Sequence, residues 1–264
     1  MKISVIIPTY KPAKYIHECL SSLKAQTLIE TEFEVLIILN GCKEPWYSEL
    51  FNFVKEEMVG LNVRLIQIDS PGVSNARNIG MENSGGEYIA FIDDDDRVSP
   101  NYLENLLAAM GEQKHVVVVS NFYSFDEKNE IHGDYVHDAF IRNKTSHAKS
   151  LIKSRGFLSA VHGKLISKEI IGNKKFSTTM TNGEDTLFMT EISNKIKEIW
   201  KTSDDTIYWR RIRAESASRK KRSIWNHIKN KSCQISRYIL LALQPWRGYD
   251  LRFVWFRIIG AFLK

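Results

Sequence analysis

Four consecutive aspartates, Asp93 to Asp96, directly follow the apolar run 88–92. Adjacent carboxylates repel one another, and a chain that keeps four of them has a use for a cation at this place. Alternating carboxylates such as Asp93 and Asp95 can hold a hard divalent cation through oxygen, and such a metal can neutralise a leaving diphosphate. The alternative is a solvated turn whose first aspartate caps a helix that begins near Pro100.

A second acidic pair, Glu184-Asp185, follows Gly183 and opens a helical pattern that continues to Met189. Acidic residues in the first turn of a helix are favoured by the helix dipole, which by itself explains the pair. A carboxylate at a helix start is also suited to take a proton from an attacking hydroxyl. The pair is therefore the second candidate centre for chemistry.

The first 120 residues alternate between short β-rich runs and helical patterns, which predicts a parallel, doubly wound α/β sheet. Ser99 suits the N-cap and Pro100 the first turn of the last of these helices. The predicted strands are 3–7, 33–39, 63–68, 88–92 and 116–119, and the predicted helices are roughly 13–25, 46–59, 73–83 and 100–112.

Ligands of such sheets bind beyond the carboxyl ends of the strands. This rule gathers four polar segments along one rim of the predicted sheet: 8–10, 40–41, 69–71 and 93–96. We therefore expect the residues that could do chemistry to lie together.

The remainder of the chain divides into a less regular part and a basic tail. Residues 121–218 predict a helix at 184–195 and strands at 198–201 and 206–211. Residues 219–264 hold eleven Lys/Arg and one acid, so the net charge of +6 for the whole chain leaves −4 for residues 1–218. We expect residues 1–120 and 121–218 to form two halves of one domain, with 219–264 as a separate tail and a boundary at the run 218–222.

Composition indicates a soluble globular protein, with 43% hydrophobic and 26% charged residues. The three cysteines, Cys19, Cys42 and Cys233, are far apart and odd in number, so a reducing cytoplasm is the expected compartment. The apolar N-terminal stretch is too short for a signal peptide, and no run approaches the roughly 20 apolar residues that span a bilayer.

Three blocks stand in order along the chain: VIIPTYKPAKYIHECLSSLKAQT, then SPGVSNARNIGMENSGGEYIAFIDDDD, then NGEDTLF. They resemble the family 2 glycosyltransferases of the GT-A fold, whose middle block has Gly-Val-Ser, Ala-Arg-Asn, Gly-Glu-Tyr and Asp-x-Asp segments. The resemblance covers about residues 1–215. It implies a Rossmann-like, mainly parallel sheet with helices on both faces, and a Mg²⁺ or Mn²⁺ ion that carries the diphosphate of a nucleotide-sugar.

The resemblance assigns the nucleoside to Pro8-Thr9-Tyr10 and to Asn40. The family commonly has Asp-Asp-Gly-Ser where this chain has Leu39-Asn40-Gly41-Cys42. Because an asparagine amide both donates and accepts, Asn40 can read a uracil edge or another base, so UDP is the expected nucleotide with other bases left open. The structural alternatives are a strand-ending turn at 8–10 and a tight turn at 40–41.

The resemblance also implies how phosphates and metal are held. Asp69 ends the third strand and is counted with the nucleotide-binding residues, as is Arg77, which reaches the pyrophosphate or the aspartates; its alternative is a surface salt bridge of little energy. Asp95 is the expected direct metal ligand. Asp93 contacts the ribose or the metal shell, and Asp94 occupies the variable middle position.

By the same resemblance, Asp185 is the general base and Glu184 orients the acceptor. Lys164 is expected to touch the diphosphate or the acceptor, while the neighbouring His162 is a weak candidate, since a lone histidine is more often structural. Arg211 and Arg213 alternate onto one face of a strand, and one of them is expected to close over the leaving phosphates; the sequence does not choose between them.

The tail predicts helices with mixed apolar and basic character. In 219–243 the apolar side is formed by Ile224, Trp225, Ile228, Ile235, Ile239 and Leu243. The stretch LRFVWFRIIGAFLK then interleaves arginine with bulky apolar residues. This composition favours an interfacial helix on an anionic membrane leaflet, at the inner face of the cell membrane, over a helical pair folded back on the body.

The predicted function is metal-dependent, inverting transfer of a sugar from a nucleotide-sugar, expected to be a UDP-sugar, to a glycan or lipid-linked acceptor in surface-polysaccharide synthesis. A nucleotidyltransferase is the second hypothesis, but it needs a Gly-rich basic loop after the first strand, and 8–12 is a poor version of one. A nucleic-acid-binding protein is suggested by the pI of about 9.1. Because the positive charge is confined to the tail, nucleic acid is not an expected partner.

Overall fold

The structure, a computed structural model, describes residues 1–213 and 224–263, without the side chains of residues 224–227. Its centre is an eight-stranded sheet with the strand order β3-β2-β1-β4-β10-β6-β11-β9. Strands β1 (Ile3–Thr9), β2 (Phe33–Asn40), β3 (Asn62–Ile68) and β4 (Tyr88–Phe91) run parallel to one another. With β6 (Val116–Val119), all five strands predicted in the first 120 residues are present within two residues of the expected bounds.

The second half of this sheet is not purely parallel. Strand β10 (Lys164–Ser167), which the sequence analysis did not predict, lies between β4 and β6 and is antiparallel to both. Beyond it, β11 (Glu198–Lys201) is parallel to β6, and the short β9 (His147–Ala148) forms the edge. Strands from both halves of the sequence thus share one sheet.

A smaller four-stranded sheet brings the end of the domain to the aspartates. Its order is β5 (Arg97–Val98), β12 (Ile207–Arg211), β7 (Asn121–Phe125) and β8 (Ile131–His132). Strand β5 immediately follows the four aspartates, and β12 pairs with it antiparallel. Residues near 210 therefore lie beside residues near 95.

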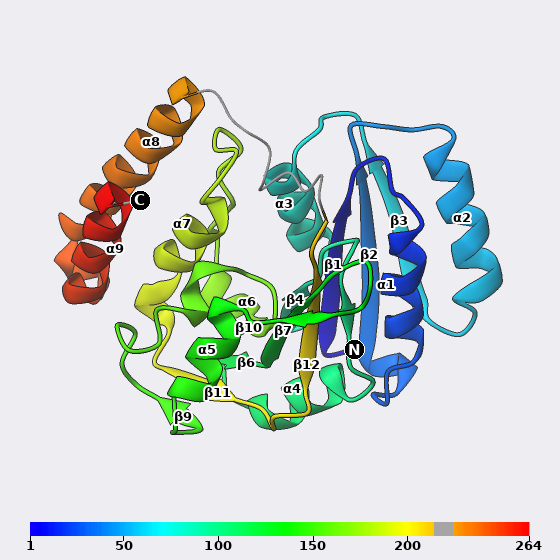
Figure 1. Ribbon diagram of the computed structural model, residues 1–264, viewed down its shortest axis with the longest axis horizontal. Helices are drawn as coiled ribbons and strands as arrows, with labels where there is room; N and C mark the ends of the chain where they lie inside the picture. The colour runs from blue at the N-terminus through cyan, green and yellow to red at the C-terminus, as the bar shows by residue number, and fades with distance from the viewer. Residues whose placement is uncertain (214–223, 264) are drawn as a thin grey trace.

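Helices cover both faces of the central sheet: Figure 1 shows α1 and α2 on one side of β1–β3 and α3 on the other. The helices of the body are α1 (Tyr15–Lys24), α2 (Trp46–Glu57), α3 (Val73–Asn83), α4 (Tyr102–Met110), α5 (Tyr135–Arg142), α6 (Lys168–Ile171) and α7 (Glu184–Glu191), with 3-10 turns at Glu30–Glu32, Phe157–Ser159 and Ser193–Lys195. The four helices predicted in the first half are all present.

The predicted N-cap at Ser99 is wrong. Helix α4 begins at Tyr102, and Asn101 occupies its N-cap position. The Ser99 hydroxyl donates to the side chain of Asn101 at 2.7 Å and accepts the backbone N–H of Ile207 at 3.0 Å. Ser99 therefore joins β12 to the aspartate segment, through a partner 108 residues away that no local pattern indicates.

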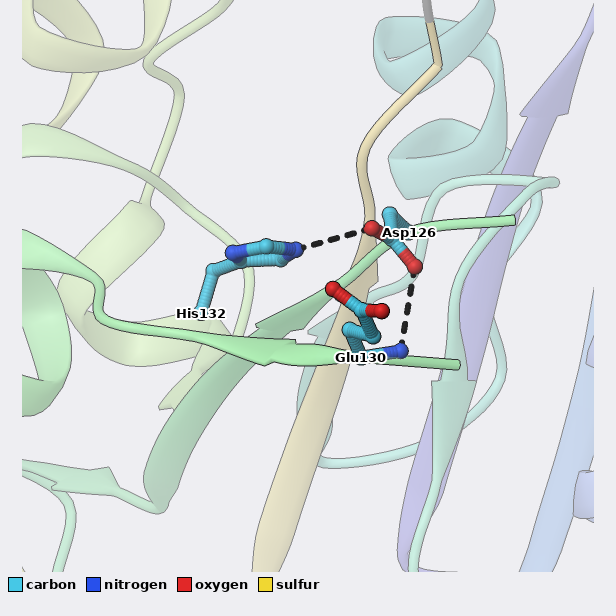
Figure 2. A group of neighbouring side chains, drawn as sticks. All are labelled: Asp126, Glu130 and His132. Carbon is cyan, nitrogen blue, oxygen red and sulfur yellow. Dashed lines mark hydrogen bonds and ion pairs between the residues drawn. The ribbon is translucent and has the colours of Figure 1, made fainter. Parts of the chain in front are cut away.

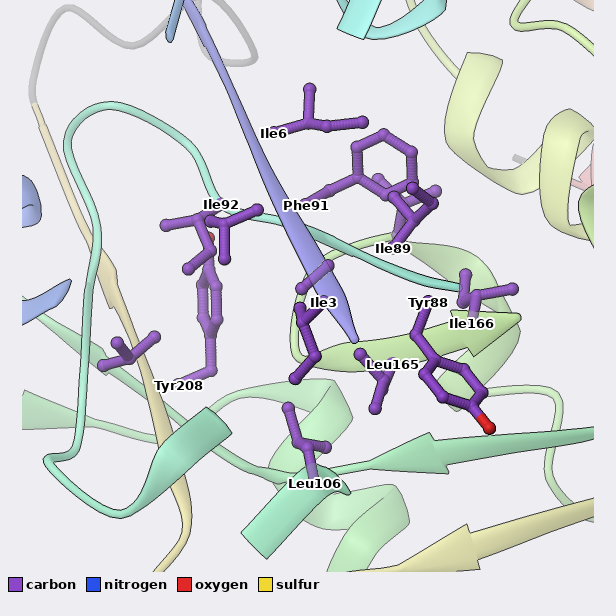
Figure 3. Packing of buried hydrophobic residues seen from close by; sticks show 14 of the residues in the cluster. Ile3, Ile6, Tyr88, Ile89, Phe91, Ile92, Leu106, Leu165, Ile166 and Tyr208 are labelled. Atoms are coloured by element: carbon purple, nitrogen blue, oxygen red, sulfur yellow. The ribbon is translucent and has the colours of Figure 1, made fainter. Parts of the chain in front are cut away.

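Strands β1, β2 and β4 are buried along their whole length, and their side chains form the centre of the core. Figure 3 shows residues of β1 and β4 packed with Leu165 and Ile166 of β10. Two glycines permit close packing against β1. A Cβ at Gly80 of α3 would lie 2.4 Å from Ile6 Cγ2, and a Cβ at Gly86 would lie 2.7 Å from backbone atoms of Ile3 and Ser4. All three cysteines are free, as expected from their number and spacing.

The tail forms two helices, α8 (Ile224–Ala242) and α9 (Leu251–Leu263), with a 3-10 turn at Pro245–Arg247 between them. They pack on each other and on α7, at the left edge of Figure 1. A second apolar cluster holds this pair to the body: Met180, Leu187, Tyr238, Leu241, Tyr249, Val254, Ile258 and Ala261. The fold-back arrangement considered from the sequence is therefore present.

The predicted apolar side of α8 packs on the body only in part, through Ile235. Ile228, Ile239 and Leu243 are exposed, whereas Tyr238 and Leu241 are buried. The predicted boundary run 218–222 lies outside the described residues. Among the residues that the structure describes, no helix is both long enough and apolar enough to cross a membrane.

Candidate active site

A cleft of about 420 Å³ opens at the carboxyl ends of β1, β2 and β4, where the sheet rule places ligands. Of the residues predicted to bind the nucleotide or the metal, it brings together Pro8, Tyr10, Asn40, Asp93, Asp94, Asp95 and Arg213. Tyr10 is 52% exposed, and the Lys11 ammonium lies 5.4 Å from the centre of its ring. An exposed aromatic face beside a cation is suited to stack on a nucleobase.

Thr9 and Asn40 support the cleft through bonds to its frame. The Thr9 hydroxyl donates to Asp94 Oδ2 at 2.5 Å. The Asn40 amide donates to the Thr9 carbonyl at 2.7 Å and accepts the Gly72 N–H at 2.8 Å. These bonds leave one N–H and one lone pair of the Asn40 amide for a ligand.

Asp69 does not join this group. It is exposed just beyond β3, its carboxylate accepts a hydrogen bond from the Gln67 amide at 3.0 Å, and it does not line the cleft. The strand-end rule placed it on the correct rim, but β3 is the edge strand of the sheet, so its end lies away from the centre of the site.

Each of the four aspartates has a different partner. Asp93 pairs with Arg77 at 3.1 Å, Asp95 with Arg213 at 2.6 Å, and Asp94 with Thr9. The buried Asp96 accepts the Tyr208 hydroxyl at 2.6 Å and the backbone N–H of Arg211 at 2.8 Å. Asp96 thus fixes β12 beside the cluster and has both oxygens in use, and it caps no helix.

The crowding of these carboxylates shows in their acidity. Burial and the neighbouring aspartates raise the pKa of Asp94 to about 7 and that of Asp95 to about 6, and burial with Asp95 raises the pKa of Asp96 well above its ordinary value. Burial also opposes ionisation of Asp93, but His162 and Arg77 outweigh it, so the pKa of Asp93 is lowered. Negative charge in the cluster is incompletely compensated.

A divalent cation fits this donor set. Carboxylate oxygens of Asp93, Asp95 and Asp96 lie within 4.8 Å of one another, and hard cations prefer oxygen ligands. Because Asp96 is committed to Tyr208 and β12, Asp93 and Asp95 are the residues that would hold an ion. A cation there would also relieve the uncompensated charge.

Arg77 of α3 joins the aspartate cluster to the second acidic pair. Its guanidinium donates to Asp185 Oδ1 at 2.7 Å and to Asp93 Oδ1 at 3.1 Å, and it lies 3.9 Å from Glu184. The side chain is buried; burial opposes its charge, but the three carboxylates outweigh that effect and raise its pKa. The two centres, 92 residues apart in sequence, therefore share one arginine.

His162 lies near the other carboxylate oxygens of Asp93 and Asp185, those that Arg77 does not bond to. Its Nε2 is 3.4 Å from Asp93 Oδ2 and 3.7 Å from Asp185 Oδ2, and its ring stacks near Tyr208. Burial lowers the pKa of His162 while Asp93 and Asp185 oppose that shift. The histidine regarded as a weak candidate from sequence is thus in direct contact with both centres.

Lys164 lies behind this histidine and not in the open cleft. It is 1% exposed, and its ammonium donates to the His162 carbonyl at 2.8 Å. Burial lowers its pKa to about 7, against the attraction of Asp185. The structure therefore does not bring Lys164 to the surface that a diphosphate would contact, because β10 carries it into the core of the sheet.

The two candidate arginines after β12 differ in their partners. Arg211 is buried, donates to the Asp95 carbonyl at 3.0 Å and to Glu18 at 2.5 Å, and packs over the Tyr15 ring. Arg213 is partly exposed, pairs with Asp95 at 2.6 Å, and lines the first cleft. Arg213 is the arginine with a side of its guanidinium open to a ligand.

A second cleft of about 490 Å³ adjoins the first, and the two share Val73, Asp93, Asp95 and Arg213. It contains the acidic pair, Arg77 and His162. The continuous space thus runs from the exposed Tyr10 ring, past the aspartates, to Asp185. It can hold an extended ligand whose two ends meet different residues.

Another acidic group lies away from these clefts, at the hairpin between β7 and β8 (Figure 2). Asp126 accepts the backbone N–H groups of Lys128 and Glu130 at 2.9 and 3.0 Å, and its other oxygen lies 3.0 Å from His132 Nε2. These contacts stabilise the hairpin turn, which explains why the three residues lie together.

Sequence reasoning missed Tyr208, whose hydroxyl accepts the Asp93 N–H at 3.2 Å while donating to Asp96. It also missed Glu18, the partner of Arg211. Tyr208 reads as an ordinary aromatic residue of a strand, and Glu18 as an acidic residue of a helical first turn. Neither carries a local signal that distinguishes it.

Known proteins with sequences similar to this chain include glycosyltransferases. The sequence model described as "Glycosyl transferase family 2" matches residues 4–172. Glycosyltransferase GlyA of Streptococcus pneumoniae serotype 4 is 28% identical over 246 residues, which cover 86% of this chain and 33% of GlyA. Poly(ribitol-phosphate) beta-N-acetylglucosaminyltransferase TarS of Staphylococcus aureus strain Mu50 is 26% identical over 211 residues, 79% of this chain and 35% of TarS. The chain spans about a third of the length of these curated relatives.

Among solved structures, S. aureus TarS 1–349 in complex with UDP-GlcNAc matches with a TM-score of 0.77 at 21% identity, over 99% of this chain and 72% of that chain. This likeness confirms the expected GT-A-type α/β fold, including the helical C-terminal extension.

Proposed function

This chain belongs to glycosyl transferase family 2, and from that premise we propose that it transfers a sugar from a nucleoside diphosphate sugar to a hydroxyl of a glycan or lipid-linked acceptor in bacterial surface-polysaccharide synthesis. UDP is the proposed nucleotide, since TarS is described in complex with UDP-GlcNAc. Family membership favours this activity over the nucleotidyltransferase and nucleic-acid-binding hypotheses.

The observation that carries the proposal is the shared arginine. Arg77 holds Asp93, which faces the nucleotide cleft, and Asp185, which faces the second cleft, on one guanidinium. A transferase needs the leaving group and the base on opposite sides of the reacting carbon, at a fixed separation. One buried arginine that bonds to both carboxylates supplies such a fixed separation.

The donor would lie along the first cleft. The base stacks on Tyr10 beside Pro8, and the remaining donor and acceptor of Asn40 read its edge, with Thr9 as support. Arg213 would close over the diphosphate, and Asp93 and Asp95 would hold a Mg²⁺ or Mn²⁺ ion. When bound, such an ion neutralises charge on the leaving diphosphate.

The chemical step would take place in the second cleft. The acceptor oxygen attacks the anomeric carbon, the bond from that carbon to the phosphate oxygen breaks, and the electron pair leaves with the diphosphate. Asp185 takes the proton of the acceptor hydroxyl through Oδ2, because Arg77 holds Oδ1. Glu184, whose pKa is raised by burial and by Asp185, orients the acceptor. Attack opposite the leaving group inverts the anomeric configuration.

Nucleotide binding tests this proposal directly. Calorimetry with UDP, GDP, CDP and dTDP, with and without Mn²⁺, should show metal-dependent binding of one nucleotide, expected to be UDP. Asp95→Asn should lose it, whereas Asp126→Asn, in the hairpin group of Figure 2, should keep it. Failure of every nucleotide to bind the folded wild type would refute the proposal, and loss in Asp126→Asn alone would move the metal to the hairpin.

We propose in addition that the tail contacts an anionic membrane surface. The support is the outer face of α8 and α9, where large apolar side chains stay exposed beside arginines. This outer face comprises Ile228, Ile239, Leu240, Leu243, Trp246, Arg247, Leu251, Arg252, Trp255, Ile259, Phe262 and Leu263. Exposed apolar residues with cations between them suit the interface of a negatively charged leaflet.

Sedimentation with vesicles tests the contact. The protein should bind phosphatidylglycerol vesicles and bind phosphatidylcholine vesicles weakly, and Trp255→Ser should weaken binding. Phe51→Ser, which changes an equally exposed aromatic residue on α2, serves as the control and should bind as the wild type does. Equal sedimentation of Trp255→Ser and wild type would contradict this role for the outer face.

A further inference from the structure

A third cleft, of about 450 Å³, lies between the tail helices and the body and continues the space that leads past Asp185. It adjoins the second cleft through four shared lining residues: Ser159, Asn182, Gly183 and Thr186. Since Gly183 directly precedes the acidic pair, a molecule that occupies the third cleft can extend to Asp185. The three clefts thus form one path from Tyr10 to the tail.

The lining of the third cleft is positively charged. It includes Arg155, Lys231 from α8 and Arg257 from α9, and none of its lining residues in the described part of the chain is acidic. This contrasts with the first two clefts, in which each arginine faces a carboxylate. Water or a bound ligand must therefore compensate the positive charge of the third cleft.

Arg257 carries this argument furthest. Its guanidinium is partly buried and donates to the Leu158 carbonyl at 2.7 Å, the Arg155 carbonyl at 3.2 Å and the Ser159 hydroxyl at 3.3 Å. No carboxylate of the described residues lies within 4 Å of it. Burial lowers the pKa of Arg257 to about 10, with the nearby Arg155 adding to the shift. A buried cation without a counter-ion is costly and favours binding of an anion.

Arg155 and Lys231 stand at the more open part of the cleft. Arg155 is exposed, its guanidinium packs 4.7 Å from the centre of the Phe256 ring, and it donates to the Ile152 carbonyl at 3.1 Å. Arginine and lysine are the side chains that bind phosphate oxygens in proteins, arginine through paired N–H groups. The chemistry of the lining thus matches a phosphate, and Phe256 adds an apolar wall.

We propose that the third cleft binds a phosphate group of the acceptor, so that an acceptor hydroxyl several bonds away reaches Asp185. This inference rests on the proposed function for its role in transfer, but not for the binding of phosphate itself. It assigns the tail helices a part in substrate recognition, in addition to any contact with a membrane. The acceptor class is a phosphate-bearing one, either a lipid-linked diphosphate glycan or a water-soluble polyol phosphate.

Binding of inorganic phosphate to the metal-free protein, followed by calorimetry, tests the site without relying on catalysis. The double variant Arg155→Gln/Lys231→Gln keeps Arg257, which bonds to the body, and should weaken phosphate binding at least tenfold. Lys174→Gln, in a different cleft, controls for loss of one positive charge. No phosphate binding by the wild type, or equal binding by the double variant, would overturn the proposal.

Steady-state transfer then separates the two acceptor sources. For whichever phosphate-bearing acceptor the enzyme uses, the KM of the double variant should be at least tenfold higher than that of the wild type. Its kcat and its affinity for UDP should be near those of the wild type. The lipid-linked diphosphate glycan in detergent and a soluble polyol phosphate oligomer are the two arms, and the same glycan without phosphate is the reference. An equal KM change for the phosphate-free glycan would contradict a phosphate site. If UDP fails to bind while phosphate binding still depends on Arg155 and Lys231, the proposed function falls and the anion site remains.

Discussion

The buried lysine of β10 gives a quantitative prediction. Lys164 is 1% exposed, and burial lowers its pKa from 10.5 to about 7. In the unfolded chain the lysine keeps its ordinary pKa, so the unfolded state binds more protons between pH 7 and 10.5, and folding stability of the wild type rises with pH across that window. At about 1.4 kcal/mol per pKa unit, the full penalty approaches roughly 5 kcal/mol at and below pH 7 and falls to about 1 kcal/mol near pH 9.5.

Lys164→Met removes this titration. We expect the free energy of unfolding of the variant, relative to wild type, to drop by about 3 kcal/mol between pH 7 and pH 9.5. Loss of the hydrogen bond to the His162 carbonyl lowers the variant's free energy of unfolding by about 1 kcal/mol at both pH values, so it does not affect this difference. Urea unfolding of both proteins at the two pH values measures the difference, since groups common to both cancel.

Lys197→Met, at an exposed lysine, provides the control and should show no such pH-dependent difference. A constant difference between Lys164→Met and wild type across the pH range would refute the reasoning. It would mean that Lys164 reaches water in the folded protein and keeps an ordinary pKa.

Three further changes test the packing and the site. Gly86→Ala should lower the free energy of unfolding in urea by about 1–3 kcal/mol, because the new Cβ would meet the β1 backbone at 2.7 Å, while Gly133→Ala, with no atom within 4 Å, should be close to neutral. Tyr208→Phe should cost about 1–3 kcal/mol in the same assay, since a buried carboxylate loses its 2.6 Å donor; a neutral result would contradict that role. Arg77→Lys should lower kcat by about a hundredfold with UDP binding retained, because an ammonium cannot bond to both carboxylates as the guanidinium does, and an unchanged kcat would rule out Arg77 as the residue that positions the base.

The parallel half of the fold could be predicted because its strands have a recognisable sequence pattern. Strands β1 and β2 are buried on both faces, so their sequences are continuous apolar runs that end in turn residues. The rim rule then brought Tyr10, Asn40 and the aspartates together without knowledge of any contact. The same rule also grouped Asp69 with them, although Asp69 does not line the cleft. The order of strands in a sheet decides which strand end is central, and that order is not a local property of the sequence.

The remainder depends on partners far away in sequence. Strand β10 begins with a buried lysine, so its pattern did not indicate an internal strand, although β6 of the same length was predicted. Helix α8 has apolar residues on more than one side, and only the shape offered by α7 and α9 selects Tyr238 over Ile239 for burial. The sequence likewise left Arg211 and Arg213 equivalent, and Glu18 of α1 is what distinguishes them.

The pairing of β12 with the aspartate segment has a consequence for the order of events during synthesis. Asp96 receives its bonds from Tyr208 and Arg211, which follow it by 112 and 115 residues. At the usual rate of roughly 5–20 residues per second, a growing chain exposes its aspartates on the order of ten seconds before those partners are made. Throughout that interval the apolar strands of β1 to β4 can already pair, while the carboxylates beside them have no β12 to hold them. The nucleotide end of the cleft is encoded first in the chain, yet it is completed only when the last strand arrives.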